Sequence, residues 1–129
     1  MRLLQLSSLW ISIPSAVSYF LGSPIDALVI GLQCVTSVVH HTYYTKATLI
    51  VDRAVTAGVA ARTLYKAYDS PVALSVFAVS YGYISVIYVY GKFYSCFASD
   101  PDADRRCRYH ASMHFLCGGA FMLYVYLIA

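Results

Sequence analysis

Long apolar runs separated by short polar breaks dominate the chain. Three of the breaks are Gly22-Ser23-Pro24, Asp69-Ser70-Pro71 and Asp100-Pro101-Asp102, and residues of these types favour turns and helix ends. A membrane-spanning helix needs about 20 mostly apolar residues. The pattern therefore predicts an all-α, polytopic membrane helix bundle that forms a single domain over residues 1–129. About five transmembrane helices are expected, over residues 3–21, 27–44, 48–66, 71–90 and 109–128.

The third run is the most polar of the five. It contains Arg53, Arg62 and Asp52, which is the only carboxylate within a predicted span. Lipid does not accept charged groups without a partner. We therefore expect this helix to pack inside the bundle, with Arg62 extending outward to the membrane surface. In the first run, Pro14 removes a backbone donor and is expected to kink the helix.

Residues 1–21 also resemble a cleaved signal peptide. Arg2 precedes an apolar run, and Ala16-Val17-Ser18 has small residues like those of a cleavage site. The apolar stretch is longer than the roughly 7 to 15 residues usual for the apolar core of a signal peptide. We therefore expect a first membrane helix here, and cleavage would leave all the histidines in place.

Composition and charge indicate the class of protein and its orientation. Hydrophobic residues make up 60% of the chain and charged residues 12%, against about 25% charged residues in soluble domains. We therefore expect an integral, multi-pass membrane protein. Because Lys and Arg gather on the cytoplasmic side of membrane proteins, a cytoplasmic N-terminus and an outside or lumenal C-terminus are predicted. The basic residues on the predicted cytoplasmic side are Arg2, Lys46, Lys92, Arg105, Arg106 and Arg108, with Arg53 close by, and those on the other side are Arg62 and Lys66.

All four histidines fall in two short apolar stretches. His110 and His114 are four residues apart, so they project from one helix face and can bind the same metal ion. His41 lies about one turn from the end of its predicted helix, at the same depth in the membrane. Three imidazoles with an open fourth position are typical of a catalytic Zn²⁺ site. His41 is favoured as the third ligand because Ser37 stands four residues before it on the same helix face, and His40 stays open as the alternative.

Two further polar residues would complete such a site. Asp52, about one turn inside the third predicted helix, could take a proton from a metal-activated water and return it to a leaving group. The Ser37 hydroxyl could orient the water or a substrate oxygen. Both residues also allow a structural interpretation: Asp52 could pair with Arg53 or Arg62, and Ser37 could form a hydrogen bond between helices.

The order and spacing of these residues resemble the signature of the CREST superfamily of membrane hydrolases, most of all its alkaline ceramidase branch. Ser37 is followed by His41 and Asp52, and the C-terminal stretch reads His110-Ala111-x-x-His114-x-Leu116-x-Gly118. The resemblance covers the second, third and fifth predicted helices. It implies that His41, His110 and His114 bind zinc, and that Ser37 and Asp52 contact the zinc-bound water.

Together these features predict a zinc-dependent intramembrane hydrolase that cleaves an amide or ester bond in a lipid, as a ceramidase does. The expected partners are the bilayer and a ceramide-like or other acyl lipid that enters laterally, and no nucleic acid. Two other functions stay open. One is a receptor or assembly factor that keeps zinc as a structural ion, and the other is an electron carrier with haem held between two histidines. A homo-oligomer, in which a second copy completes the pocket, also stays open.

Overall fold

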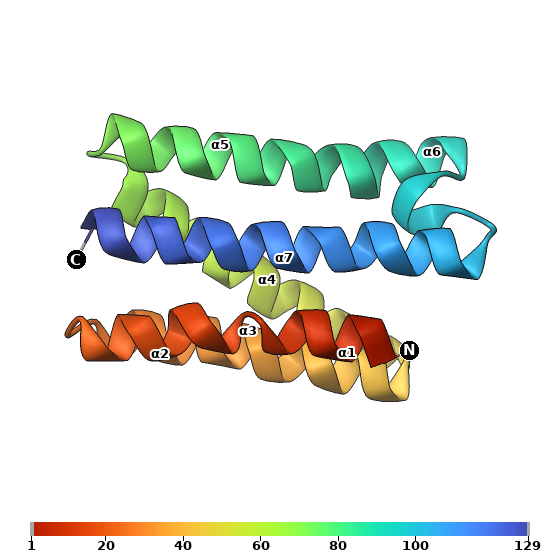
Figure 1. Cartoon of the computed structure of the whole chain (residues 1–129), viewed down its shortest axis with the longest axis horizontal. Helices are drawn as coiled ribbons and strands as arrows, with labels where there is room; N and C mark the ends of the chain where they lie inside the picture. Colours follow the sequence, from red (N-terminus) through yellow and green to blue (C-terminus); the bar gives the residue numbers. More distant parts are fainter. Residues whose placement is uncertain (1, 129) are drawn as a thin grey trace.

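The computed structural model describes residues 2–128, which are almost entirely helical and contain no strand. The predicted all-α helix bundle is therefore confirmed. Most of the helices run along one long axis, α4 passes obliquely behind α7, and the two termini lie at opposite ends (Figure 1). The elements are α1 (Arg2–Leu9), α2 (Ser12–Phe20), α3 (Pro24–Tyr43), α4 (Lys46–Ala67), α5 (Pro71–Ser85), the π-helical η1 (Val86–Tyr90), α6 (Gly91–Tyr94), the 3-10 helix η2 (Phe97–Ser99) and α7 (Ala103–Ile128).

Four helical segments of the described chain are long and apolar enough to cross a membrane. They are Arg2–Phe20, Pro24–Tyr43, Pro71–Tyr94 and Ala103–Ile128. Length and composition thus support the predicted membrane protein. The remaining predicted span, residues 48–66, is helical as part of α4, but α4 is not among the four segments.

α4 lies at the side of the bundle, so the prediction that it packs inside is wrong. Its buried residues are Val59, Thr63 and Ala67, whereas the Ile50 and Val51 side chains are 67% and 52% exposed. The reason is that α1 and α2 each pack against both α3 and α7. The two halves of the first span therefore bridge α3 and α7, whereas α4 packs mainly on α3.

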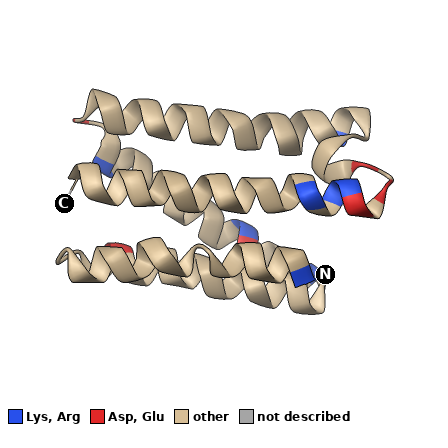
Figure 2. Cartoon of the chain, in the orientation of Figure 1, with Lys and Arg blue, Asp and Glu red and all other residues tan. Residues whose placement is uncertain are grey.

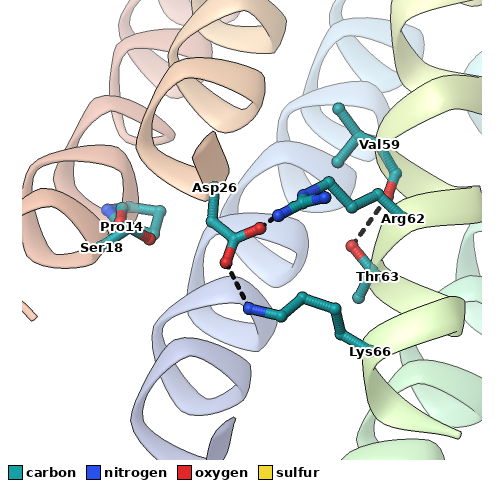
Figure 3. Close-up of polar contacts among 7 residues, drawn as sticks. All are labelled: Pro14, Ser18, Asp26, Val59, Arg62, Thr63 and Lys66. Atoms are coloured by element: carbon teal, nitrogen blue, oxygen red, sulfur yellow. Dashed lines mark hydrogen bonds and ion pairs between the residues drawn. The ribbon is translucent and has the colours of Figure 1, made fainter. Parts of the chain in front are cut away.

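A triad of charged side chains fastens α4 to α3. The buried Asp26 carboxylate, in the first turn of α3, accepts hydrogen bonds from Arg62 Nε at 2.6 Å and from Lys66 Nζ at 2.7 Å (Figure 3). Arg62 therefore pairs with a carboxylate, which corrects the expectation that it extends outward to the membrane surface. Asp26 lies inside a span that begins three residues earlier than predicted, so Asp52 is not the only carboxylate within a membrane segment.

The first span is broken at the position that Pro14 dictates. α1 ends at Leu9 and α2 begins at Ser12. Pro14 has no N–H, and its ring clashes with the carbonyl four residues earlier, which belongs to Trp10. The predicted kink is confirmed, and the break presents the Trp10 indole to Gly118 of α7.

Basic residues concentrate at one end of the bundle. In Figure 2 most of the Lys and Arg residues lie where α1 and α7 begin, and the opposite end carries few. At the crowded end Asp102 caps α7: its carboxylate accepts the backbone N–H groups of Arg105 and Asp104. These hydrogen bonds, chiefly the one from Arg105, hold the pKa of Asp102 below its usual range. The uneven distribution is the one on which the orientation prediction rests.

The contact between Trp10 and Gly118 gives a stability prediction. A Cβ at position 118 would overlap the indole ring, whereas a Cβ at Gly119 would meet nothing within 4 Å. We expect Gly118→Ala to destabilise the protein by about 1–3 kcal/mol, as overpacking does. Gly119→Ala is the matched control and should be neutral or stabilising by up to about 1 kcal/mol, from helix propensity. Thermal unfolding in detergent measures both, and equal melting temperatures would contradict the packing argument.

Candidate metal centre

Three histidines from two helices converge near the basic end of the bundle. His41 lies in the last turn of α3, and His110 and His114 lie four residues apart on α7. One ring nitrogen from each lies within 4.8 Å of the others. The centroid of the His41 ring lies 4.8 Å from that of the His110 ring and 5.1 Å from that of the His114 ring. This group can hold a metal ion.

The hydrogen-bonding state of His41 fits a bound cation. Its side chain is 1% exposed, yet neither Nδ1 nor Nε2 has a hydrogen-bond partner in the described chain. Buried polar atoms nearly always have a partner, and an orphan suggests a missing ion or water. Three imidazole nitrogens with no thiolate or carboxylate among them are also a donor set that suits Zn²⁺. The residues present therefore fit a zinc ion, although the geometry does not identify the metal.

Two serines of α1 orient His114. Its Nδ1 lies 2.8 Å from Ser7 Oγ and 3.2 Å from Ser8 Oγ. Both hydroxyls are directed at the Leu4 carbonyl, at 3.0 and 2.8 Å. A hydroxyl has one proton to donate, so both serines accept from Nδ1–H. The Nε2 lone pair of His114 is then left free, which is the arrangement in which an outer hydrogen bond fixes a metal-binding histidine.

Sequence reasoning overlooked Ser7 and Ser8. The available signal was a pair of adjacent hydroxyls within an apolar run, but serine is common in membrane helices as a contact between them. What brings the pair to His114 is that α1 packs against both α3 and α7. That packing cannot be read from the run itself.

His40 points to a different neighbour. Its Nδ1 lies 3.2 Å from the hydroxyl of Thr48, which belongs to the N-terminal capping box of α4. The structure therefore brings His41, and not His40, together with the α7 pair. Which of them binds a metal stays a prediction.

Ser37 and Asp52 line one cavity of about 430 Å³ together with His110 and His114. Ser37 Oγ lies 3.3 Å from Ser8 Oγ, within hydrogen-bonding distance. Asp52 does not belong to the three-histidine group and approaches the cavity from α4. Its Oδ1 accepts hydrogen bonds from two α3 side chains that sequence reasoning also overlooked, Thr36 at 3.2 Å and Gln33 at 3.4 Å.

Asp52 does not form the ion pair with an arginine of α4 that was its alternative, structural role, as far as the described residues show. Among residues 2–128 neither Arg53 nor Arg62 forms an ion pair with it, because Arg62 binds Asp26 and Arg53 binds Tyr88. The carboxylate is thus held by neutral donors beside the cavity.

No family model, curated protein or solved structure matches this chain. The resemblance to the CREST hydrolases, which comes from residue spacing alone, therefore stays a prediction.

Metal loading provides the test of the ligand set. The purified protein should contain about one zinc per chain, and His41→Ala, His110→Ala and His114→Ala should each remove it and lower the melting temperature, because metal binding is linked to folding. His40→Ala is the matched control and should keep the metal. Elemental analysis measures the zinc. Loss of zinc in His40→Ala alone, or a haem absorption band in a zinc-free preparation, would contradict the assignment.

Proposed function

We propose that this protein is a zinc-dependent membrane hydrolase that cleaves an amide or ester bond in an acyl lipid. The observation that carries the proposal is a group of three imidazoles, two of which line a cavity together with a buried hydroxyl and a carboxylate. Four helical segments of the described chain are long and apolar enough to span a membrane. The spacing of these residues, which resembles that of the alkaline ceramidases, points in the same direction.

Each residue has a distinct part in the proposed reaction. His41, His110 and His114 would hold the zinc ion, which supplies Lewis acidity and lowers the pKa of water. The Ser37 hydroxyl would hydrogen-bond a substrate oxygen. Asp52 would accept the proton of the attacking water and pass it to the leaving nitrogen or oxygen. Two donors already hold its Oδ1, so Oδ2 is the oxygen available for this transfer.

The lining of the cavity favours a substrate with an acyl chain. Ile11, Val59 and Phe121 contribute apolar walls beside the polar groups. An apolar pocket with a few convergent polar groups is the usual form of a binding site. A lipid that enters between the helices from the bilayer would place its chain along these walls and its amide or ester bond at the histidines.

Catalysis by Asp52 can be separated from its structural role. Asp52→Asn can still accept the hydrogen bonds of Thr36 and Gln33, but it cannot take a proton, so we expect zinc content and fold to persist while hydrolysis falls by about 10²-fold or more. Mass spectrometry of a mixed lipid extract incubated with each protein would detect released fatty acids or long-chain bases.

Thr36→Val is the matched control. It removes one hydrogen bond to the same carboxylate, so a much smaller loss of activity is expected. Equal product from wild type and Asp52→Asn would refute the general-base role. No product from zinc-loaded wild type would favour a receptor or assembly factor.

We also propose that the N-terminus is cytoplasmic and the C-terminus outside or lumenal. The support is the crowding of basic residues at one end of the bundle (Figure 2) and the positive-inside rule. This orientation requires that α4 passes through the membrane with the other helices, its polar groups bound to α3 and η1.

Cysteine labelling tests this orientation and the passage of α4. In a background without the native cysteines, Asp100→Cys should react with an impermeant reagent only from the cytoplasmic side. Asp69→Cys, in the turn between α4 and α5, is the matched control and should react only from the opposite side. Ala47→Cys, in the first turn of α4, should react only from the cytoplasmic side. Reaction of Ala47→Cys and Asp69→Cys from the same side would mean that α4 does not cross. The reverse of the whole pattern would invert the orientation.

A further inference from the structure

Two neighbouring residues of α4 point to opposite walls of the cavity. Successive residues of an α-helix are separated by about 100° around its axis. Asp52 accordingly contacts Thr36 of α3, while Arg53 contacts Tyr88 of η1. Arg53 and Tyr88 line the same cavity as Ser37 and the α7 histidines. A positive group and the carboxylate therefore both reach the cavity from α4, and each is held by a different neighbouring element.

Arg53 differs from the other arginine of α4 in its lack of an acidic partner. Arg62 and Lys66 both pair with Asp26, whereas Arg53 forms no ion pair within residues 2–128. It stands about two turns beyond Lys46, the first residue of α4. A charge at such a depth without a partner is costly in hydrocarbon and commonly marks a binding path.

Tyr88 holds the guanidinium and leaves most of its donors free. The Tyr88 hydroxyl accepts one hydrogen bond from Arg53 Nη2 at 2.7 Å. The guanidinium carbon also lies 5.5 Å from the centre of the Tyr88 ring, within the range of a cation–π contact. Arginine has five N–H donors, so four remain. Their planar fork matches the oxygens of phosphate or carboxylate.

The backbone at Tyr88 is itself unusual. Val86–Tyr90 is a π-helical segment inserted between α5 and α6. Such segments are rare and often occur at functional sites, because the extra residue in the turn redirects side chains. Ser85, Tyr88 and Val89 from this segment and its flank all line the cavity.

We infer that Arg53, held in place by Tyr88, binds the anionic headgroup of the acyl lipid that occupies this cavity. The inference deepens the proposed function and rests on it for the nature of the reaction. It narrows the substrate class from acyl lipids in general to those with a phosphate or similar oxyanion near the cleaved bond. A neutral lipid would leave the guanidinium without its counter-charge.

The test measures binding and not hydrolysis. A dialkyl ether lipid with a phosphate headgroup, and the same ether lipid without the phosphate, have no cleavable amide or ester bond. Their affinities for the purified full chain in detergent are compared by competition with a fluorescent alkyl lipid. We expect wild type to favour the phosphate lipid by about tenfold or more, and Arg53→Gln to lose this preference while binding the neutral lipid within about twofold of wild type.

Three variants separate the headgroup site from other effects. Arg105→Gln removes an exposed charge at the same end of the bundle, and it should keep the preference, since general attraction of the basic surface is not the cause. Tyr88→Phe should reduce the preference in part, because the ring stays and the hydroxyl goes. Lys92→Gln removes a second exposed charge outside the cavity and should also keep the preference. Because neither probe lipid has a cleavable bond, failure of the zinc-hydrolase proposal and failure of this inference give different results.

Four outcomes would overturn the inference. They are equal affinities of wild type for both lipids, an unchanged preference in folded Arg53→Gln, loss of the preference in Arg105→Gln to the same extent as in Arg53→Gln, and displacement of the phosphate lipid by inorganic phosphate at equal concentration. The last would indicate a site for free anions. If Arg53→Gln does not fold, Arg53→Lys serves in its place: it keeps the charge without the fork, so a reduced preference supports the inference and an unreduced one refutes it.

Discussion

The two ion pairs of Asp26 hold α4 in the bundle, and the cavity depends on α4. Few α4 side chains are buried, and those few lie toward its C-terminal half. Hydrophobic burial therefore gives this helix little attachment in comparison with α3 or α7. Arg62 and Lys66 are fixed at the Asp26 carboxylate instead (Figure 3). Because the pairs lie one turn apart on α4, they set both the position and the rotation of the helix, and with them the direction of Asp52 and Arg53.

Just as the Asp26 ion pairs fix the position of α4, α1 fixes the positions of the side chains around the histidines. The backbones of α3 and α7 are held apart by the two halves of the first span, which contact both, and only long side chains meet across the gap. α1 places Ser7 and Ser8 beside His114, and the second serine also reaches Ser37. The break that Pro14 imposes ends α1 just after these serines, so the kink and the site arise from the same local sequence.

The sequence was sufficient where a pattern is local. Helix type, the break near Pro14 and the pairing of His110 with His114 follow from periodicity and spacing. It was insufficient where the answer depends on which helices touch. The predicted span begins at residue 27 and so leaves out Asp26, because Pro24 is treated as a break although proline is also common at the start of a helix. Asp52 is then the only carboxylate offered to Arg62. Ser7, Ser8, Thr36 and Gln33 have no periodic signal at all.

The charged residues in the two halves of α4 differ in their partners, and this difference separates a stabilising half from a half that faces the cavity. Near its C-terminal end, Arg62 and Lys66 are both bound to the buried Asp26 carboxylate, so that region stabilises the fold. Near its N-terminal end, Asp52 is held by neutral donors and Arg53 by a phenol, so both keep their charge available to the cavity. Groups of opposite charge on the two sides of one pocket would orient a lipid whose reacting bond and headgroup differ in polarity. Had Asp52 and Arg53 paired with each other, both would have been neutralised and the pocket would have had no means to distinguish one end of a lipid from the other.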